Sequence, residues 1–277
     1  MLASTELGSG PPVLLLHGQP GTGASWKPLM AMLDREFRLL APDRTGYGSS
    51  PGEAVGLAAN AEQVAEFLAE RGAAPATVVA HSWSGGAAVL LASRHPAMVK
   101  SLVLVGAACT PDSIGVLDRW LNIPMVGDVL TVAGLAGIGS VLPWVRGLAL
   151  PVAPGRIRDR LAAALPDREV MRGARGALGR NKRSFMIEQQ ALVDELPAVT
   201  AALGALDLPV AVVCGQWDIV VPTRAAASLA RAVPGARLTI VPRAGHFVAR
   251  DDPEALAELI RDTDRRASSA RDGRAIS

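Results

Sequence analysis

The fold is decided by the stretch Val78-Val79-Ala80-His81-Ser82-Trp83-Ser84-Gly85-Gly86. It joins a predicted apolar strand, Thr77–Ala80, to a predicted helix, Gly85–Arg94. Such a sharp turn strains the backbone of its apex residue and leaves room only for small side chains two positions away on either side. Ala80 and Ser84 meet that requirement around Ser82. The pattern small-x-Ser-x-small therefore predicts that Ser82 is a nucleophile at the apex of the turn.

Ser84 is a rival for the same role, because Ser82 and Gly86 flank it at the same spacing. Ser82 is favoured because the apex should follow the strand directly. The first turn of the following helix would also bring free N–H groups and a positive dipole end to the place where an oxyanion forms. An ordinary strand-to-helix turn with a capping serine is the alternative that this stretch alone leaves open.

On both sides of this turn, short apolar runs alternate with helical patterns. Strands are expected over Val13–Leu16, Arg38–Ala41, Thr77–Ala80, Ser101–Val105, Pro209–Cys214 and Arg237–Val241. Helices are expected over Ala24–Leu33, Leu57–Arg71, Gly85–Arg94, Thr223–Val233 and Pro253–Asp264. The strand runs are continuously apolar, which is typical of strands buried on both faces of a parallel sheet. The predicted fold class is therefore α/β, with a doubly wound, mostly parallel sheet.

Two segments depart from regular alternation. Residues 109–206 separate two consecutive strands and carry mainly helical pattern, so we expect an inserted α-helical cap there, with residues 1–108 and 207–266 forming the core. Near the start of the chain, Thr5–Leu7 precedes a Gly-Ser-Gly-Pro turn and is expected to end an edge strand. The last residues, 267–277, are small and polar, and we expect them to be disordered.

Composition narrows the functional classes. The chain has 277 residues, of which 49% are hydrophobic, and a formal net charge of +2. Because no basic patch is paired with stacking aromatic residues, nucleic acid is not an expected partner. The start of the sequence lacks the basic and apolar regions of a secretory signal, so a cytoplasmic location is expected. Cys109 and Cys214 are then expected to be free thiols, and no cysteine or histidine spacing suggests a metal or cofactor site.

A serine nucleophile needs a general base from another loop. Of the four histidines, His246 follows the last expected strand, where Gly245 allows a bend and Phe247 can pack against the ring. His81 lies too close to the serine in sequence. His17 ends the first strand, where backbone N–H groups are expected to bind the oxyanion. His95, before a proline at a helix end, is expected to be structural. We therefore predict that His246 is the base.

The acid and the oxyanion donors also follow predicted strands. Asp218 comes after the strand that ends at Cys214, so it can meet His246 and fix its tautomer; a turn or cap residue is the alternative. The loop Gly18–Gly21 is expected to contribute the backbone N–H of Gln19, paired with that of Trp83. The turn Pro42–Ser49 is predicted to shape the pocket wall without a direct chemical role.

These motifs together resemble the α/β-hydrolase superfamily over about residues 8–264, with the cap matching only in position. They are LLLHGQPGTGASW, APDRTGYGSS, VVAHSWSGGAAVLLASRHP, GQWDIVVP and PRAGHFVARDDPEAL. The resemblance implies that Ser82 is the nucleophile, His246 the base and Asp218 the acid, with Gln19 and Trp83 as oxyanion donors. Two departures are the Ala80 and Ser84 of the elbow, where glycines are commonest, and a start shorter by about one edge strand.

The resemblance leaves several chemistries open, because a fold does not fix a substrate. A serine argues against haloalkane dehalogenases and epoxide hydrolases, which use aspartate. The favoured function is a serine hydrolase that cleaves a carboxylic ester of a small to medium apolar substrate, without cofactor or metal. Cofactor-free haloperoxidases or perhydrolases, lactonases and C–C bond hydrolases use the same triad. A non-hydrolytic catalyst or a small-molecule binding protein is a further alternative.

The cap contains an uncharged run, Val129–Val145, followed by a basic stretch over Arg156–Arg183. The run is shorter than the ~20 residues of a membrane span, and its glycines and proline weaken a helix further. Buried lid helices are the favoured interpretation. A lid that touches a lipid surface is the alternative, because an apolar face beside basic residues suits an anionic interface. Both interpretations predict an apolar pocket roof.

Overall fold

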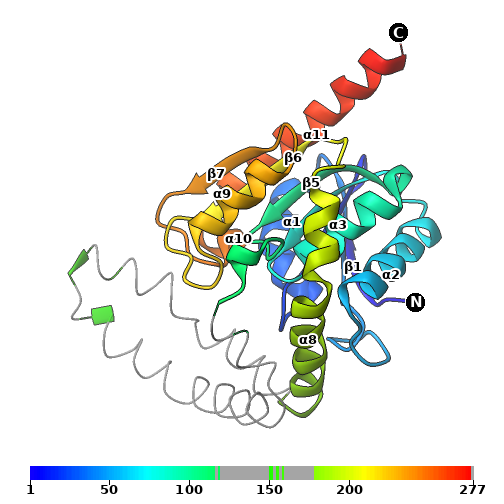
Figure 1. Ribbon diagram of the computed structural model, residues 1–277. Helices are drawn as coiled ribbons and strands as arrows, with labels where there is room; N and C mark the ends of the chain where they lie inside the picture. The colour runs from blue at the N-terminus through cyan, green and yellow to red at the C-terminus, as the bar shows by residue number, and fades with distance from the viewer. Residues whose placement is uncertain (116–117, 119–149, 152–153, 156–157, 159–177, 276–277) are drawn as a thin grey trace.

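The computed structural model describes residues 1–115, 118, 150–151, 154–155, 158 and 178–275 (Figure 1). Its centre is a seven-stranded sheet in the order β1-β3-β2-β4-β5-β6-β7. The strands are β1 (Ser4–Leu7), β2 (Pro12–Leu16), β3 (Arg38–Pro42), β4 (Ala76–His81), β5 (Val99–Val105), β6 (Val210–Gly215) and β7 (Arg237–Val241). β1 pairs antiparallel with β3 and all the other pairs are parallel. The predicted mostly parallel sheet is confirmed.

Helices cover both faces of this sheet. They are α1 (Lys27–Leu33), α2 (Leu57–Glu70), α3 (Ser84–Arg94), α8 (Leu178–Leu203), α9 (Thr223–Ala232), α10 (Val248–Asp251) and α11 (Pro253–Ala275). Alternate residues of β2 divide between two cores: Leu14 and Leu16 pack with residues of α2, α3, α8 and α9, whereas Val13 and Leu15 pack with residues of α1 and α11. A strand buried on both faces needs apolar residues throughout, which explains the continuous apolar runs in the sequence.

The predicted elements agree with the structure to within two residues at the strand ends. The expected edge strand near the start is β1. The expected helix Ala24–Leu33 divides into a 3-10 turn, Gly23–Trp26, and α1, where Pro28 occupies the first turn. Proline suits that position because its missing N–H would have no partner inside the helix.

The inserted segment returns to the core through α8, whose residues Leu192, Val199 and Leu203 belong to the same core cluster as the sheet. The end of the expected cap is therefore packed as part of the core. The expectations for Val129–Val145 lie outside the described residues, as do most of those for Arg156–Arg183. Among the residues that the structure does describe, no helix is both long and apolar enough to cross a membrane.

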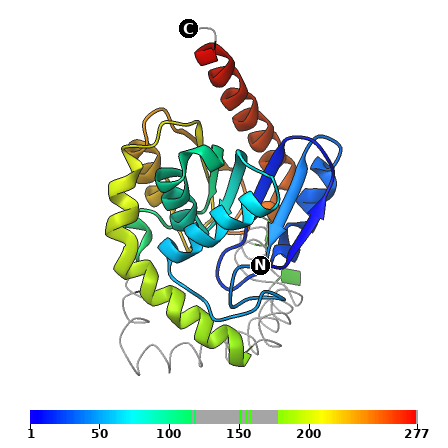
Figure 2. The same ribbon diagram turned by 90° about the vertical axis from the view of Figure 1, so that its right-hand side faces the viewer.

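The expectation of disorder over 267–277 differs from the structure, because α11 continues to Ala275. Its C-terminal end stands away from the body in both views (Figures 1 and 2). Ala267 is buried, and the hydroxyl of Ser268 donates to the carbonyl oxygen of Asp264 one turn earlier. The small residues that suggested disorder are compatible with a helix that starts from a well-packed stretch around Ile260.

Candidate active site

Ser82 stands at the turn between β4 and α3, at the carboxyl edge of the sheet. Its φ of 56° lies in the left-handed region, which few residues other than glycine adopt. The backbone holds it there: Ser82 N donates to the carbonyl oxygen of Val105 at 2.9 Å, and Ser82 O accepts from Gly85 N at 3.0 Å and from Ala108 N at 3.2 Å. The strained apex predicted for this serine is present, and β5, the loop after it and the start of α3 hold it in place.

The hydroxyl of Ser84 is engaged in the structure. It donates toward two carbonyl oxygens, that of Leu16 at 3.0 Å and that of His81 at 2.9 Å. The side chain is fully buried. Ser84 therefore ties the start of α3 to the end of β2, and of the two serines in the turn only Ser82 has a hydroxyl without such bonds in the described part of the chain.

His246 and Asp218 meet as the sequence predicted. His246 Nδ1 donates to Asp218 Oδ2 at 2.8 Å, and the two residues are only 8% and 7% exposed. The other carboxylate oxygen, Oδ1, accepts from Val220 N at 2.9 Å and from Val221 N at 2.8 Å. These backbone donors orient the carboxylate. With Nδ1 protonated, Nε2 of His246 is the ring atom left to accept a proton.

Ser82 makes no hydrogen bond to His246 within the described residues. In an enzyme without substrate such bonds are often long and tighten only when the substrate is bound. The loop that carries His246 nevertheless reaches the elbow, because the ring of His81, which precedes Ser82, lies 4.6 Å from the ring of His246 between centroids.

Gly106 lies directly behind the acid–base pair. A Cβ atom at this position would lie 3.1 Å from Asp218 Oδ2 and 3.1 Å from His246 Nδ1. Its φ of +51° also favours glycine. A side chain at this position would crowd the acid–base pair, so glycine suits the close approach of the loop after β5, which sequence reasoning missed.

His81 positions the loop that carries His246. Its Nε2 lies 2.9 Å from the carbonyl oxygen of His246, where it acts as the donor. Burial, followed by the nearby His246, lowers the pKa of His81 to about 3. The ring therefore stays neutral at neutral pH and adds no charge beside His246. The closeness of His81 to Ser82 in the sequence was a reason to reject it as the base, but nothing in the sequence indicated this contact.

The loop after β2 approaches the serine closely at Gly18. A Cβ atom there would lie 2.9 Å from Ser82 Cβ and 2.9 Å from His81 Nδ1, so any other residue would push the loop away. Gln19 follows, and its side chain donates to Gln189 Oε1 of α8 at 2.8 Å. Among the described contacts, the backbone N–H groups of Gln19 and Trp83 have no acceptor, as a pair of oxyanion donors requires.

The turn after β3 is held in place by side chains of its own residues. Asp43 accepts hydrogen bonds from Gly23 N and Ser49 N, both at 2.8 Å, and so holds the turn together. Arg44 is buried and forms an ion pair with Glu188 of α8. The sequence analysis assigned no chemical role to this turn, and it could not show the ion pair, because Glu188 lies 144 residues away along the chain.

The two cysteines are free and buried, and burial raises the pKa of both Cys109 and Cys214 to about 12. Such thiols stay protonated at neutral pH and make poor nucleophiles. In the part of the chain that the structure describes, no three His, Cys, Asp or Glu side chains gather as metal ligands would.

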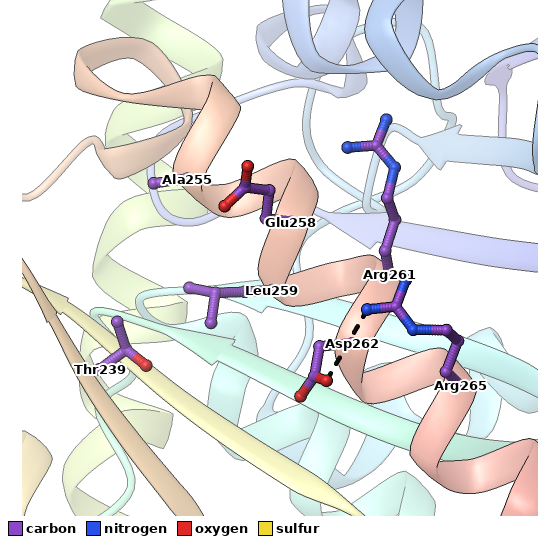
Figure 3. Close-up of a pocket in the computed structure, with 7 residues that line it drawn as sticks. All are labelled: Thr239, Ala255, Glu258, Leu259, Arg261, Asp262 and Arg265. Atoms are coloured by element: carbon purple, nitrogen blue, oxygen red, sulfur yellow. Dashed lines mark ion pairs between the residues drawn. The ribbon is translucent and has the colours of Figure 1, made fainter.

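A groove of about 560 Å³ lies elsewhere, between α11 and β7 (Figure 3). Its lining residues are Thr239, Ala255, Glu258, Leu259, Arg261, Asp262 and Arg265. Three of its four charged residues form ion pairs: Arg261 with Glu36, and Asp262 with both Arg237 and Arg265. None of the predicted site residues lines this groove, so the candidate active site is at the elbow.

Residues 11–253 match the family described as alpha/beta hydrolase fold. An uncharacterized protein of Mycobacterium tuberculosis (strain ATCC 25618 / H37Rv) is 30% identical over 91% of this chain and 75% of its own length. The 2-hydroxymuconate semialdehyde hydrolase of Pseudomonas putida is 27% identical over 92% of this chain and 87% of its own length.

The fold also matches solved structures. An esterase from Thermogutta terrifontis superimposes with a TM-score of 0.73 at 23% identity, covering 96% of this chain and 93% of the esterase. At that level of identity the match concerns the fold alone. With the strained serine, the buried acid–base pair and the family match taken together, the chain belongs to the α/β hydrolase fold family.

Proposed function

We propose that this protein is a serine hydrolase that cleaves a carboxylic ester of a small to medium apolar substrate through an acyl-enzyme on Ser82. The observation that carries the proposal is the buried hydrogen bond from His246 Nδ1 to Asp218 Oδ2, 2.8 Å long, at the same sheet edge as the strained Ser82. A histidine held in this tautomer has Nε2 free to act as a general base.

In the proposed cycle, Ser82 Oγ attacks the ester carbonyl carbon while His246 Nε2 takes its proton. The backbone N–H groups of Gln19 and Trp83 stabilise the negative oxygen of the tetrahedral intermediate. His246 then gives the proton to the alcohol that leaves, and an acyl group remains on Ser82. A water molecule activated by His246 attacks this acyl group, and the acid is released.

Apolar side chains beside the acid and base support an apolar substrate. Ile219, Val220 and Phe247 are 74%, 57% and 38% exposed, and they adjoin Asp218 or His246 in sequence. Exposed apolar patches on a protein surface often mark binding sites. They would suit an apolar acyl or alcohol group at the entrance to the site.

Labelling with a fluorophosphonate tests the nucleophile. The wild type should be labelled at Ser82, as located by peptide mass spectrometry, and the Ser82→Ala variant should not. A panel of p-nitrophenyl esters of increasing acyl length then tests the substrate class, and medium chains should be preferred over acetate. Each buried methylene contributes up to about 0.8 kcal/mol, so a few should change the preference tenfold or more.

Lactones and a vinylogous diketone belong in the same panel. The diketone tests for C–C bond cleavage, one of the alternative reactions that the same triad can catalyse. Faster turnover of the diketone than of every ester would replace ester hydrolysis as the function while keeping Ser82 as the nucleophile. A wild type without labelling or turnover of any of these compounds would overturn the proposal.

A further inference from the structure

Arg44 is the most extensively bonded charged side chain near the elbow. Its guanidinium is fully buried, and Nε donates to the carbonyl oxygen of His17 at 3.0 Å, while Nη2 donates to that of Gly18 at 3.2 Å. Its backbone N–H donates to His17 Nε2 at 3.0 Å. One residue from the turn after β3 thus holds two successive carbonyl groups of the loop after β2.

The Gly18 carbonyl has a particular significance, because it belongs to the same peptide group as the N–H of Gln19. That peptide is trans, so its C=O and N–H point in opposite directions. Fixing the carbonyl oxygen therefore fixes the direction of the N–H. His17 Nδ1 donates to the same carbonyl at 2.8 Å, so two donors hold this one oxygen. Both also draw electron density from the peptide, which strengthens its N–H as a donor.

Arg44 is itself held by α8. Glu188 accepts hydrogen bonds from Nη1 and Nη2 of Arg44, and from the hydroxyl of Tyr47 at 2.8 Å. The backbone carbonyl of Glu188 accepts from Trp83 Nε1 at 2.7 Å. The guanidinium carbon of Arg44 lies 4.6 Å from the ring of Trp83, within the range of a cation–π contact. The pair therefore contacts Trp83 and the carbonyl oxygen of the peptide group that carries the Gln19 N–H.

We propose that Arg44 and Glu188 are positioning residues for the oxyanion hole: Glu188 holds Arg44, and Arg44 aims the N–H of Gln19. The inference rests on the proposed function. Because Glu188 belongs to α8, the ion pair is one of the contacts that join this helix to the residues proposed as oxyanion donors. Both side chains are fully buried and do not contact the substrate in this proposal. Their loss should therefore lower kcat and leave KM nearly unchanged.

The test replaces both partners, because removal of one alone would leave a buried charge without its partner and could prevent folding. The double variant Arg44→Met/Glu188→Met keeps similar volumes without charge. Loss of one oxyanion donor lowers kcat about 10²- to 10³-fold, so kcat should fall about 10²-fold while KM changes by less than about threefold. The single variant Arg44→Lys, which keeps the charge, should also have a lower kcat than the wild type. Lysine cannot donate to both carbonyls and the carboxylate in this geometry.

A matched control is available at the other end of the strands. Lys100 Nζ donates to Asp264 Oδ1 at 2.8 Å, in another largely buried ion pair near the start of β5. The variant Lys100→Met/Asp264→Met should keep the kcat of the wild type. A loss of rate in both double variants would indicate general destabilisation and would contradict the proposed role.

A transition-state analogue separates positioning from a structural effect. A trifluoromethyl ketone forms a tetrahedral adduct with the serine, so its Ki should rise in the Arg44/Glu188 double variant by the same factor as kcat/KM falls. The Ki of the corresponding non-reactive amide should not change. An active wild type with an unaffected double variant would overturn this inference alone, whereas a wild type that neither labels nor turns over would overturn the proposed function.

Discussion

Ser84 shares its single hydroxyl proton between the carbonyl oxygens of Leu16 and His81, at 3.0 and 2.9 Å. This contact separates two serines that sequence spacing alone treats almost alike. A hydroxyl committed to buried carbonyl groups cannot present its oxygen to a substrate. Ser82, two residues earlier, carries the backbone strain expected at the apex of the elbow.

The first prediction concerns these two serines. Ser82→Ala should lower kcat by a factor on the order of 10⁴ or more, because members of a catalytic triad act as a unit. Ser84→Ala should keep kcat within a few-fold but lower the stability by about 1 kcal/mol, for the loss of a buried hydrogen bond. Ester hydrolysis and urea unfolding measure the two effects. An inactive Ser84→Ala beside an active Ser82→Ala would reverse the assignment.

The second prediction concerns the acid. In Asp218→Asn, the amide can donate to His246 Nδ1 and so favour the tautomer with the proton on Nε2, which cannot accept the serine proton. We expect a folded protein that has lost on the order of 10⁴-fold in kcat, with His246→Ala within about tenfold of Ser82→Ala. Circular dichroism checks the fold and steady-state kinetics the rate. Near-normal turnover of Asp218→Asn would point to a different acid.

The third prediction compares two glycines with the same backbone conformation. Gly106 and Gly72 have φ of +51° and +54°, but only at Gly106 would a new Cβ atom meet Asp218 and His246; nothing lies within 4 Å at Gly72. Alanine at either position should cost about 1–2 kcal/mol of stability for its left-handed backbone. Only Gly106→Ala should also lower kcat, by at least tenfold. Equal kcat in the two variants would show that the acid–base pair tolerates displacement.

The fourth prediction concerns stability at mildly acidic pH. Burial lowers the pKa of His81 to about 3, and burial together with Arg44 lowers the pKa of His17 well below 6.5. Below pH 6.5 the unfolded chain binds protons that the folded protein does not, so stability is full above 6.5 and is lost as the pH falls. Each histidine contributes a slope of up to about 1.4 kcal/mol per pH unit.

Urea unfolding between pH 7.5 and 5 measures that slope. His81→Gln and His17→Gln should each flatten it, whatever constant amount of stability the substitution itself removes. The comparison uses the slope and not the midpoint at one pH, so a general loss of packing does not affect it. Slopes equal to that of the wild type in both variants would mean that these rings take up protons in the folded protein.

The sheet could be predicted from the sequence because burial on both faces demands continuous apolar runs, as in Val13–Leu16. Ser82, Asp218 and His246 could be placed because each follows a strand, and the carboxyl ends of parallel strands meet at one edge of the sheet. Side-chain contacts between segments far apart in the sequence could not be predicted in this way. Arg44 and Glu188 each look like an ordinary surface charge in the sequence, and only the packing of α8 makes them a buried pair.

Two further features depended on packing. Nothing around Gly106 in the sequence indicates that a side chain there would meet His246, because the two residues are 140 positions apart along the chain. The helical end of the chain was missed because the residues after Ala267 are polar, whereas their conformation follows from the buried helix that precedes them.

One face of α8 is fastened to the loop after β3 and to the start of α2. Ser184 donates to the carbonyl oxygen of Gly46, Glu188 binds Arg44, and Glu195 accepts from Ala58 N, and these three residues follow a helical spacing. For protein engineering, these contacts indicate where a replaced segment should end. Residues 116–177 could be exchanged for the corresponding segment of a relative to alter substrate preference, provided that residues 178–203 of this chain are kept.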